Sequence, residues 1–190
     1  YSYRALSEYE KWCYDRLYND FFYRRHNEFW YGKAMWKLPP LLDYNSMLTC
    51  AEDLGMIPDC VPAVMDELQI LALEIQRMPK DPKVEFGNTW SYPYYSVCTT
   101  STHDMPGIRA WWESDKAMSQ RFYNNVLHEG GEAPYFAEPW ICSKILDLHL
   151  NSPAMLCVLP LQDWLSIDGS LRRMNPNEEL INIPAISRHY

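Results

Sequence analysis

The sequence predicts an α/β protein in which about four parallel strands follow a long helical segment. Residues 3–37 hold few helix breakers and repeat apolar and aromatic residues at helical spacing. From residue 46 onward, short apolar runs alternate with helical segments, which is the pattern of strand–helix units that pair into a parallel sheet. Four such strands would make half of an eight-stranded barrel. We therefore expect a single domain over residues 1–190, made of a helical segment at 1–40, a half-barrel at 46–165 and a C-terminal loop at 166–190.

The helical segment is predicted as one long helix, or as two helices joined near Asn27. Proline lacks a backbone N–H and clashes with the preceding turn, so Pro39 and Pro40 are expected to end it. Its apolar positions at helical spacing are Tyr9, Trp12, Cys13, Leu17, Phe21, Phe22 and Trp30.

Four short apolar runs are the predicted strands, and helical patterns lie between them. The strands are expected at 46–50, 70–76, 95–98 and 154–159. The helices are expected at 62–68, 107–126 and 136–150, with a polar loop at 78–93, and the last strand leads into the run at 161–165.

Composition excludes several classes of partner. A net charge of −8 without a basic run disfavours binding to a nucleic-acid backbone. No apolar stretch approaches the roughly 20 residues that span a bilayer, so we expect no membrane partner. The 6 cysteines form no C-x-x-C pair and lie at no metal-site interval from histidines, which favours free thiols in a reducing cytoplasm and no metal. The 14 Tyr and 8 Trp suit a core, and they also suit a sugar-binding cleft.

The first candidate site is the His103-Asp104 pair, which follows the predicted strand at 95–98. The carboxyl ends of strands in α/β folds are where side chains meet a ligand. The pair has another interpretation, in which Asp104 caps a helix that begins near Pro106.

The second candidate site is the Glu52-Asp53 pair, which follows the predicted strand at 46–50. Two adjacent acids at this place could also be solvated turn residues. In a barrel, however, Glu52 and Asp104 would both face one mouth, and carboxylates around one cleft are the machinery of glycosidic-bond cleavage.

Several segments resemble conserved blocks of one enzyme family. They are AEDLG at 51–55, THDMP at 102–106, IRAWW at 108–112 and LPLQD at 159–163. These blocks are similar to those of the 4-alpha-glucanotransferases, the amylomaltases or disproportionating enzymes of glycoside hydrolase family 77. Further segments are similar to the larger subtype, which includes the cytosolic plant enzyme: FYRRHNEFW at 22–30, KLPPLL at 37–42, EDLGMIPDC at 52–60, IQRMP at 75–79 and INIP at 181–184.

The resemblance implies the C-terminal half of a (β/α)8 TIM barrel that moves α-1,4-glucan segments by a retaining double displacement. It implies that Glu52 is the general acid/base, that Asp104 is the carboxylate that favours the transition state, and that His103 hydrogen-bonds the same sugar. Arg77 and Asn175 are further candidates for lining the cleft. No metal or organic cofactor is implied. We expect Asp53, Gln162 and Asp163 to support loops, and Trp111 and Trp112 to pack in the core.

One block of the family is missing from these 190 residues, namely the Arg-x-Asp-His block that carries the nucleophile. We therefore expect the chain to lack the N-terminal half of the barrel and to be inactive alone. The expected partners are an α-glucan donor, a glucose or glucan acceptor, the missing half-barrel, and a second copy of the chain at exposed half-barrel surfaces. Two alternatives stay open, which are a non-catalytic glucan-binding scaffold and a hydrolase similar to family 13.

Overall fold

The computed structural model describes residues 2–55 and 57–182, so the end of the INIP block and the last residues of the predicted C-terminal loop lie outside the described residues. The chain divides into two compact units, Tyr1–Ala72 and Leu73–Tyr190. The boundary falls inside the range 46–165 that the sequence assigns to a half-barrel. The single-domain organisation stays a prediction.

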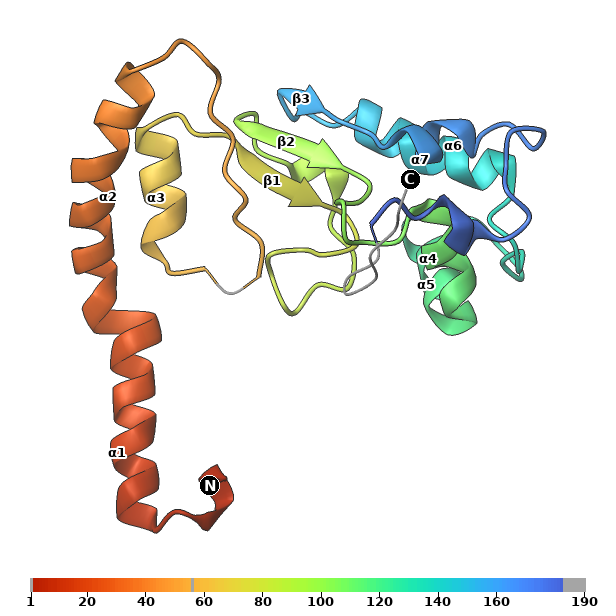
Figure 1. The fold of residues 1–190 in the computed structure, drawn as a ribbon. Coiled ribbons are helices and arrows are strands. Elements are labelled where there is room, and N and C mark those ends of the chain that lie inside the picture. Colours follow the sequence, from red (N-terminus) through yellow and green to blue (C-terminus); the bar gives the residue numbers. More distant parts are fainter. Residues whose placement is uncertain (1, 56, 183–190) are drawn as a thin grey trace. The chain divides into compact units, whose positions relative to one another are not determined.

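The first unit is mainly helical (Figure 1). Its elements are a 3-10 turn η1 (Tyr3–Ala5), α1 (Glu8–Asn19), a π-helical turn η2 (Asp20–Arg24), α2 (Arg25–Asp43) and α3 (Cys60–Glu67). Helix α1 begins at Glu8 because Ser7 and Glu10 form a capping box. The Ser7 backbone N–H donates to Glu10 Oε2 over 2.8 Å, and the Glu10 backbone N–H donates to Ser7 Oγ over 3.4 Å.

Helix α2 differs from the expectation at its end. It runs through Pro39 and Pro40 to Asp43, so the predicted stop at the prolines is wrong. Proline has a fixed φ close to the helical value, and it can stay in a helix when the turn before it gives up its hydrogen bonds. The joint between two helices, expected near Asn27, lies at the π-helical turn, where Arg24 has φ −135° and ψ −81°.

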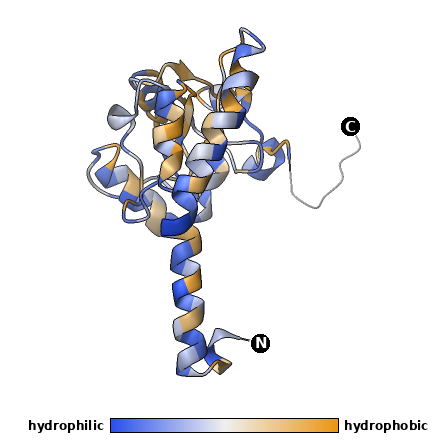
Figure 2. Cartoon of the chain, turned by 90° about the vertical axis from the view of Figure 1, so that its left-hand side faces the viewer, coloured by the Kyte–Doolittle hydropathy of each residue, from blue (hydrophilic) through white to orange (hydrophobic). Residues whose placement is uncertain are grey.

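Aromatic side chains of α1 remain accessible. Hydrophobic and hydrophilic residues are interleaved along α1 (Figure 2), and none of its residues is buried. Tyr9 and Trp12 are 73% and 56% exposed. The helical spacing of these residues therefore predicts the helix correctly, but not burial of its apolar face.

Residues 46–50 form no strand, which corrects one expectation. This segment makes a single parallel bridge between Cys50 and Leu71. The Leu71 N–H donates to the Thr49 carbonyl over 3.0 Å, and the Ala51 N–H donates to the Leu71 carbonyl over 2.8 Å. Met47 is 75% exposed, so the apolar run is not buried against a neighbouring strand. Its pairing with the segment around Leu71 therefore does not extend beyond the single bridge.

The other predicted strands are present. They are β1 (Ala72–Ile75), β2 (Ser96–Thr99) and β3 (Leu156–Cys157), in the sheet order β1-β2-β3 (Figure 1). Strands β2 and β3 are parallel, with Val97 opposite Leu156 and Cys98 opposite Cys157. The α/β class with a parallel sheet is confirmed, with three strands among the described residues in place of about four. Closure as half a barrel stays a prediction.

The helices of the second unit follow the predicted order. They are α4 (Ile108–Ser114), α5 (Lys116–Asn125), α6 (Pro139–Leu150) and α7 (Leu161–Leu165), with 3-10 turns η3 (Thr89–Ser91) and η4 (Pro176–Glu179). The helix predicted at 107–126 is broken at Asp115, which has extended backbone angles. Asp115 Oδ1 accepts the N–H groups of Ala117 and Met118 over 2.8 and 3.1 Å, and so starts a new helix.

The core of the second unit is built around Trp112 and Phe122, both 0% exposed. Trp112 donates its indole N–H to the Pro134 carbonyl over 3.0 Å, which satisfies its polar atom inside the core. Trp111 packs against the same cluster, with its ring centroid 5.0 Å from that of Phe122. The expectation that both tryptophans pack in the core is confirmed.

Within the part of the chain that the structure describes, no helix has both the length and the apolar character that spanning a bilayer requires.

All 6 cysteines are free thiols. Burial beside Cys98 raises the pKa of the Cys157 thiol to about 12, so this thiol is protonated at neutral pH.

His149 predicts a loss of stability in mild acid. It is 1% exposed, its Nδ1 lies 2.8 Å from the Ile145 carbonyl, and burial lowers its pKa. The unfolded chain therefore takes up the proton first, and the stabilisation is complete above pH about 6.5 and is lost as pH falls through the folded pKa. Urea unfolding at pH 7, 6 and 5 should show a smaller pH dependence in His149→Leu than in the wild type.

The matched control for this experiment is His128→Asn, because His128 is exposed. His128 has a φ of 56°, which asparagine tolerates better than most residues. The control should keep the wild-type pH dependence. Equal pH dependence in the wild type and His149→Leu would contradict the role of His149.

Candidate active site

The candidate site of the second unit lies where the parallel strands β2 and β3 end. The segment 100–107 leaves β2 and carries Thr102, His103 and Asp104 into α4. The segment after β3 brings Gln162 and Asp163, both in α7. Because the carboxyl ends of parallel strands meet at one edge of a sheet, these side chains come from the edge where α/β proteins bind ligands.

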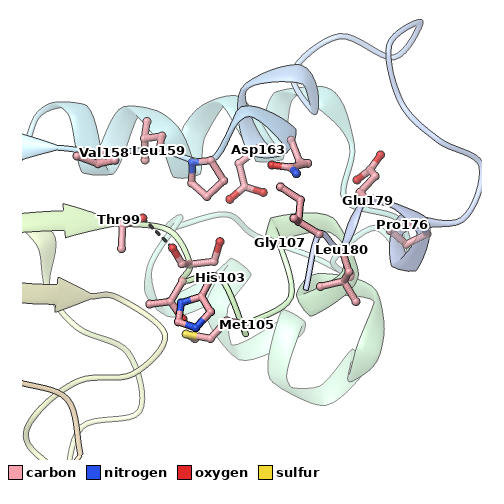
Figure 3. Close-up of a pocket in the computed structure, with 16 residues that line it drawn as sticks. Thr99, His103, Met105, Gly107, Val158, Leu159, Asp163, Pro176, Glu179 and Leu180 are labelled. Atoms are coloured by element: carbon pink, nitrogen blue, oxygen red, sulfur yellow. Dashed lines mark hydrogen bonds between the residues drawn. The ribbon is translucent and has the colours of Figure 1, made fainter. Parts of the chain in front are cut away.

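A pocket of about 210 Å³ lies at this edge (Figure 3). Its polar lining includes His103, Gln162 and the hydroxyls of Thr99, Ser101 and Thr102, and its apolar lining includes Ala110, Val158, Leu159 and Pro160. A concave site with an apolar wall and a few polar groups is the usual form of a small-ligand site.

The predicted residues His103 and Asp104 lie at the tip of the segment that leaves β2. Both are exposed, and His103 lines the pocket. Thr102 Oγ1 donates to Asp104 Oδ1 over 2.6 Å, and this hydrogen bond holds the pKa of Asp104 below its ordinary value. The Asp104 carboxylate is therefore ionised at neutral pH and is available as a hydrogen-bond acceptor.

Asp163, and not Asp104, holds the start of α4. Helix α4 begins after Gly107 without a side-chain cap from its own segment. Asp163 Oδ1 accepts the Ile108 N–H over 2.8 Å, and its Oδ2 accepts the Thr100 hydroxyl over 2.5 Å. Asp163 is 2% exposed. The interpretation of Asp104 as a cap is wrong, and the expected loop-supporting role of Asp163 is present in these contacts.

Arg77 lies just after β1, and its side chain is bonded to the backbone of the segment after β2. Its Nε and Nη2 donate to the Thr100 carbonyl over 2.9 and 2.6 Å, and Nη2 also donates to the Pro106 carbonyl over 2.7 Å. Burial lowers the pKa of Arg77 to about 10, so it remains a cation at neutral pH. Arg77 is not among the residues that line the pocket.

A partly buried ion pair, which the sequence does not reveal, holds Glu179 in the lining of the pocket. Arg109 Nη1 donates to Glu179 Oε1 over 2.5 Å and to the Arg173 carbonyl over 3.0 Å. Arg109 is the second residue of α4, and no local sequence pattern marks Glu179 as its partner. Asn175 caps η4, with its Oδ1 accepting the Asn177 N–H over 3.0 Å. It is exposed and stands beside Pro176, which lines the pocket.

The remaining predicted residue, Glu52, lies in the first unit. It is exposed and borders a second pocket of about 440 Å³, whose apolar lining includes Trp30, Leu38 and Val64. Asp53 beside it is 6% exposed. The pairing of Glu52 with Asp104 across one cleft stays a prediction, because the two residues belong to different units.

Among residues 2–55 and 57–182, no group of three or more His, Cys, Asp or Glu side chains could hold a metal ion.

Gly107 is expected to tolerate no side chain. A Cβ at this position would lie 2.8 Å from Asp163 Oδ1, which is itself fixed by two hydrogen bonds. Gly107→Ala should lower the free energy of unfolding by about 1–3 kcal/mol in urea denaturation. Gly32→Ala is the control, because a Cβ there meets nothing within 4 Å in a helix, where alanine is favoured over glycine. Equal stability of the two variants would contradict the close contact with Asp163.

The fold and the site define an α/β protein with a pocket at the carboxyl edge of a parallel sheet, lined by a histidine, hydroxyls and an apolar wall. Residues 3–190 match the family model described as 4-alpha-glucanotransferase. The chain belongs to the 4-alpha-glucanotransferase family.

Individual relatives agree with this assignment. The chain is 40% identical over 189 residues to the 4-alpha-glucanotransferase DPE2 of Oryza sativa subsp. japonica, covering 100% of this chain and 20% of that protein. It is 30% identical over 149 residues to the 4-alpha-glucanotransferase of Chlamydia pneumoniae, covering 77% of this chain and 28% of that protein. The chain thus spans about a fifth to about a quarter of the length of these relatives.

A solved structure shows a similar fold. The amylomaltase from Streptococcus agalactiae in complex with acarbose aligns with a TM-score of 0.53 and 17% sequence identity. The alignment covers 71% of this chain and 25% of the amylomaltase.

Proposed function

We propose that the protein of which this chain is a part transfers α-1,4-glucan segments from one glucan to another by a retaining double displacement. The observation that carries the proposal is the position of His103 and ionised Asp104 at the end of β2, beside the pocket at the sheet edge. Family membership supports the same activity.

The groups around the pocket suit the recognition of a pyranose. The His103 ring and the hydroxyls of Thr99 and Thr102 can exchange hydrogen bonds with sugar hydroxyls. The wall formed by Val158 and Leu159 can receive the apolar face of the sugar ring. The Asp104 carboxylate can accept hydrogen bonds from sugar hydroxyls and stabilise positive charge that develops at the reacting carbon.

Glu52 is assigned the role of general acid/base in this proposal. A protonated carboxyl donates its proton to the leaving glycosidic oxygen, and the resulting carboxylate then deprotonates the acceptor hydroxyl. Retaining transfer also needs a nucleophilic carboxylate about 5 Å from the acid. The Arg-x-Asp-His block that would carry it is not in the 190 residues.

The finer architecture forms part of the proposal. We assign the chain to the C-terminal half of a (β/α)8 barrel, in which β1, β2 and β3 are three neighbouring strands of the barrel wall. The N-terminal half is the proposed partner that supplies the nucleophile, and a second copy of the chain is the alternative cover for open strand edges. Free cysteines are consistent with a cytoplasmic location, which we also propose.

A non-catalytic glucan-binding role is the second candidate function, and the absent Arg-x-Asp-His block favours it for the isolated chain. The family match removes the ground for the other alternative, a family 13-like hydrolase.

The test of the proposed function is fragment complementation. The chain alone should release no glucose from maltotriose above the blank. Addition of a polypeptide that carries the Arg-x-Asp-His block of the same protein should restore glucose release. Glu52→Gln in this chain should then reduce the restored rate by about 10²–10⁴-fold, because the general acid is lost. A restored rate that Glu52→Gln leaves unchanged would contradict the assignment, as would glucose release by the chain alone.

A further inference from the structure

We propose that Arg77 and Asp163 act together as positioning residues that hold the segment 100–107 in the conformation presenting His103 and Asp104 to a glucan. This inference rests on the proposed function. It changes the role of Arg77 from a residue that touches sugar to one that acts through the backbone beneath the site.

The two side chains form hydrogen bonds at both ends of the same segment. At its start, Arg77 Nε and Nη2 donate to the Thr100 carbonyl, and Asp163 Oδ2 accepts the Thr100 hydroxyl. At its end, Arg77 Nη2 donates to the Pro106 carbonyl, and Asp163 Oδ1 accepts the N–H of Ile108, the next residue after the segment. The cation thus binds the acceptors and the anion binds the donors, so each end is held by both charges.

The functional side chains His103 and Asp104 lie between these two sets of hydrogen bonds. His103 and Asp104 are exposed, whereas Ser101 and Ile108 on either side are buried. A turn closes the tip, with the Met105 N–H donating to the Thr102 carbonyl over 3.2 Å and Thr102 Oγ1 donating to Asp104 Oδ1 over 2.6 Å. The tip therefore has its own short-range bonds, and its direction depends on how the two ends are anchored.

The surroundings of Arg77 favour a guanidinium over any other cation. Its carbon Cζ lies 4.9 Å from the centroid of the Trp111 ring, and two of its nitrogens share the Thr100 carbonyl. A planar fork that stacks on an aromatic ring and donates in two directions cannot be reproduced by lysine. Asp163 adds favourable electrostatic interaction with Arg77, and Gly107 leaves the space that its Oδ1 occupies.

Buried opposite charges cost desolvation, and apolar residues of similar volume often stabilise a fold equally well. Arg77 and Asp163 therefore have a role other than stability. Both hold the segment that carries His103 and Asp104, so they set the positions of these two functional side chains together. A supporting shell of this kind keeps functional groups within a fraction of an ångström of their working positions.

The test compares Arg77→Met and Arg77→Lys with the matched control Arg172→Met in this chain. Arg172 also donates to a backbone carbonyl in the same unit, that of Ser166, and its other hydrogen bond goes to Cys142 Sγ in α6. Amide hydrogen exchange should accelerate at least tenfold at Met105 and Ile108 in both Arg77 variants and not in α6, because these two N–H groups are hydrogen-bonded at the tip and at the end of the segment. Arg172→Met should leave exchange at Met105 and Ile108 unchanged. Millimolar methylguanidinium should restore protection in Arg77→Met but not in Arg77→Lys, where the cavity is filled.

Binding is measured in parallel by calorimetry with maltotriose. Arg77→Met should weaken binding at least tenfold, with recovery on addition of methylguanidinium, which a merely structural role would not produce. Uniform acceleration of exchange over the whole second unit would overturn the inference, as would unchanged affinity in a variant with a loosened segment. Absence of maltotriose binding by the wild-type chain would overturn the proposed function instead, and the exchange pattern would still decide whether the pair anchors the segment.

Discussion

Replacing Trp112 by alanine is expected to lower the free energy of unfolding by about 3–5 kcal/mol, because a large side chain at the centre of the core is lost. Trp112 is 0% exposed and packs with Phe122 and Tyr123 at ring-centroid distances of 6.3 and 6.4 Å. Truncation would leave a cavity in the core and remove the partner of the Pro134 carbonyl. Urea denaturation followed by far-UV circular dichroism measures this loss.

Trp90→Ala is the control for Trp112→Ala. Trp90 is 65% exposed, so the same chemical change removes little buried area and should stay within about 0.5 kcal/mol of the wild type. If both tryptophan variants lost the same stability, Trp112 would not be the centre of the core that the structure assigns to it.

Asp163→Ala is expected to lower the free energy of unfolding by about 3–5 kcal/mol. The change would leave the Thr100 hydroxyl and the Ile108 N–H without their acceptor, and the buried cation Arg77 without its nearby negative charge. Each buried polar group that loses its partner costs about 1–3 kcal/mol. The same denaturation experiment gives the number.

Asp163→Asn is the matched control, because the amide keeps the shape of the side chain and an oxygen for the Ile108 N–H. It should lose about 1–3 kcal/mol, since the charge and the acceptor of the Thr100 hydroxyl are removed while the acceptor of the Ile108 N–H is kept. Equal losses for Asp163→Ala and Asp163→Asn would show that the charge matters more than the two hydrogen bonds.

Local patterns in the sequence predicted most of the secondary structure, and they failed where a partner distant in sequence decides the outcome. The strands near 70–76, 95–98 and 154–159 and the helices near 62–68 and 136–150 lie where apolar periodicity places them. The run at 46–50 is also short and largely apolar, but it pairs at only one residue. Strand formation depends on the neighbour that a run finds, and periodicity does not contain that information.

Two helix boundaries could have been found from the sequence. Ser7 followed by Glu10 is the pattern of a capping box, and Asp115 before an alanine and a methionine is a typical N-cap. Pro39 and Pro40 predict a helix end where there is none, because α2 continues through both to Asp43. The preference of proline for helix ends is statistical and does not decide an individual case. Boundaries of this kind depend on one or two local hydrogen bonds.

In the candidate site, too, the features that depend on neighbouring residues could be predicted, and those that depend on residues distant in sequence could not. The position of His103 and Asp104 after a strand was predictable, because it depends on the strand alone. The cap of α4 was not, because its acceptor Asp163 lies 55 positions away from Ile108. Glu179, which pairs with Arg109 across 70 positions, was likewise invisible to local patterns.

The measurement that tests the central claim most directly is a titration of the chain with maltotriose, followed by amide chemical shifts in NMR. We predict saturable shifts at residues 101–105 and at Val158 and Leu159, which line or border the pocket. His103→Ala should weaken the binding up to about tenfold, as expected for one lost hydrogen bond. Saturable shifts confined to other parts of the chain, or no saturable shifts at all, would contradict the assignment of this pocket as a glucan site.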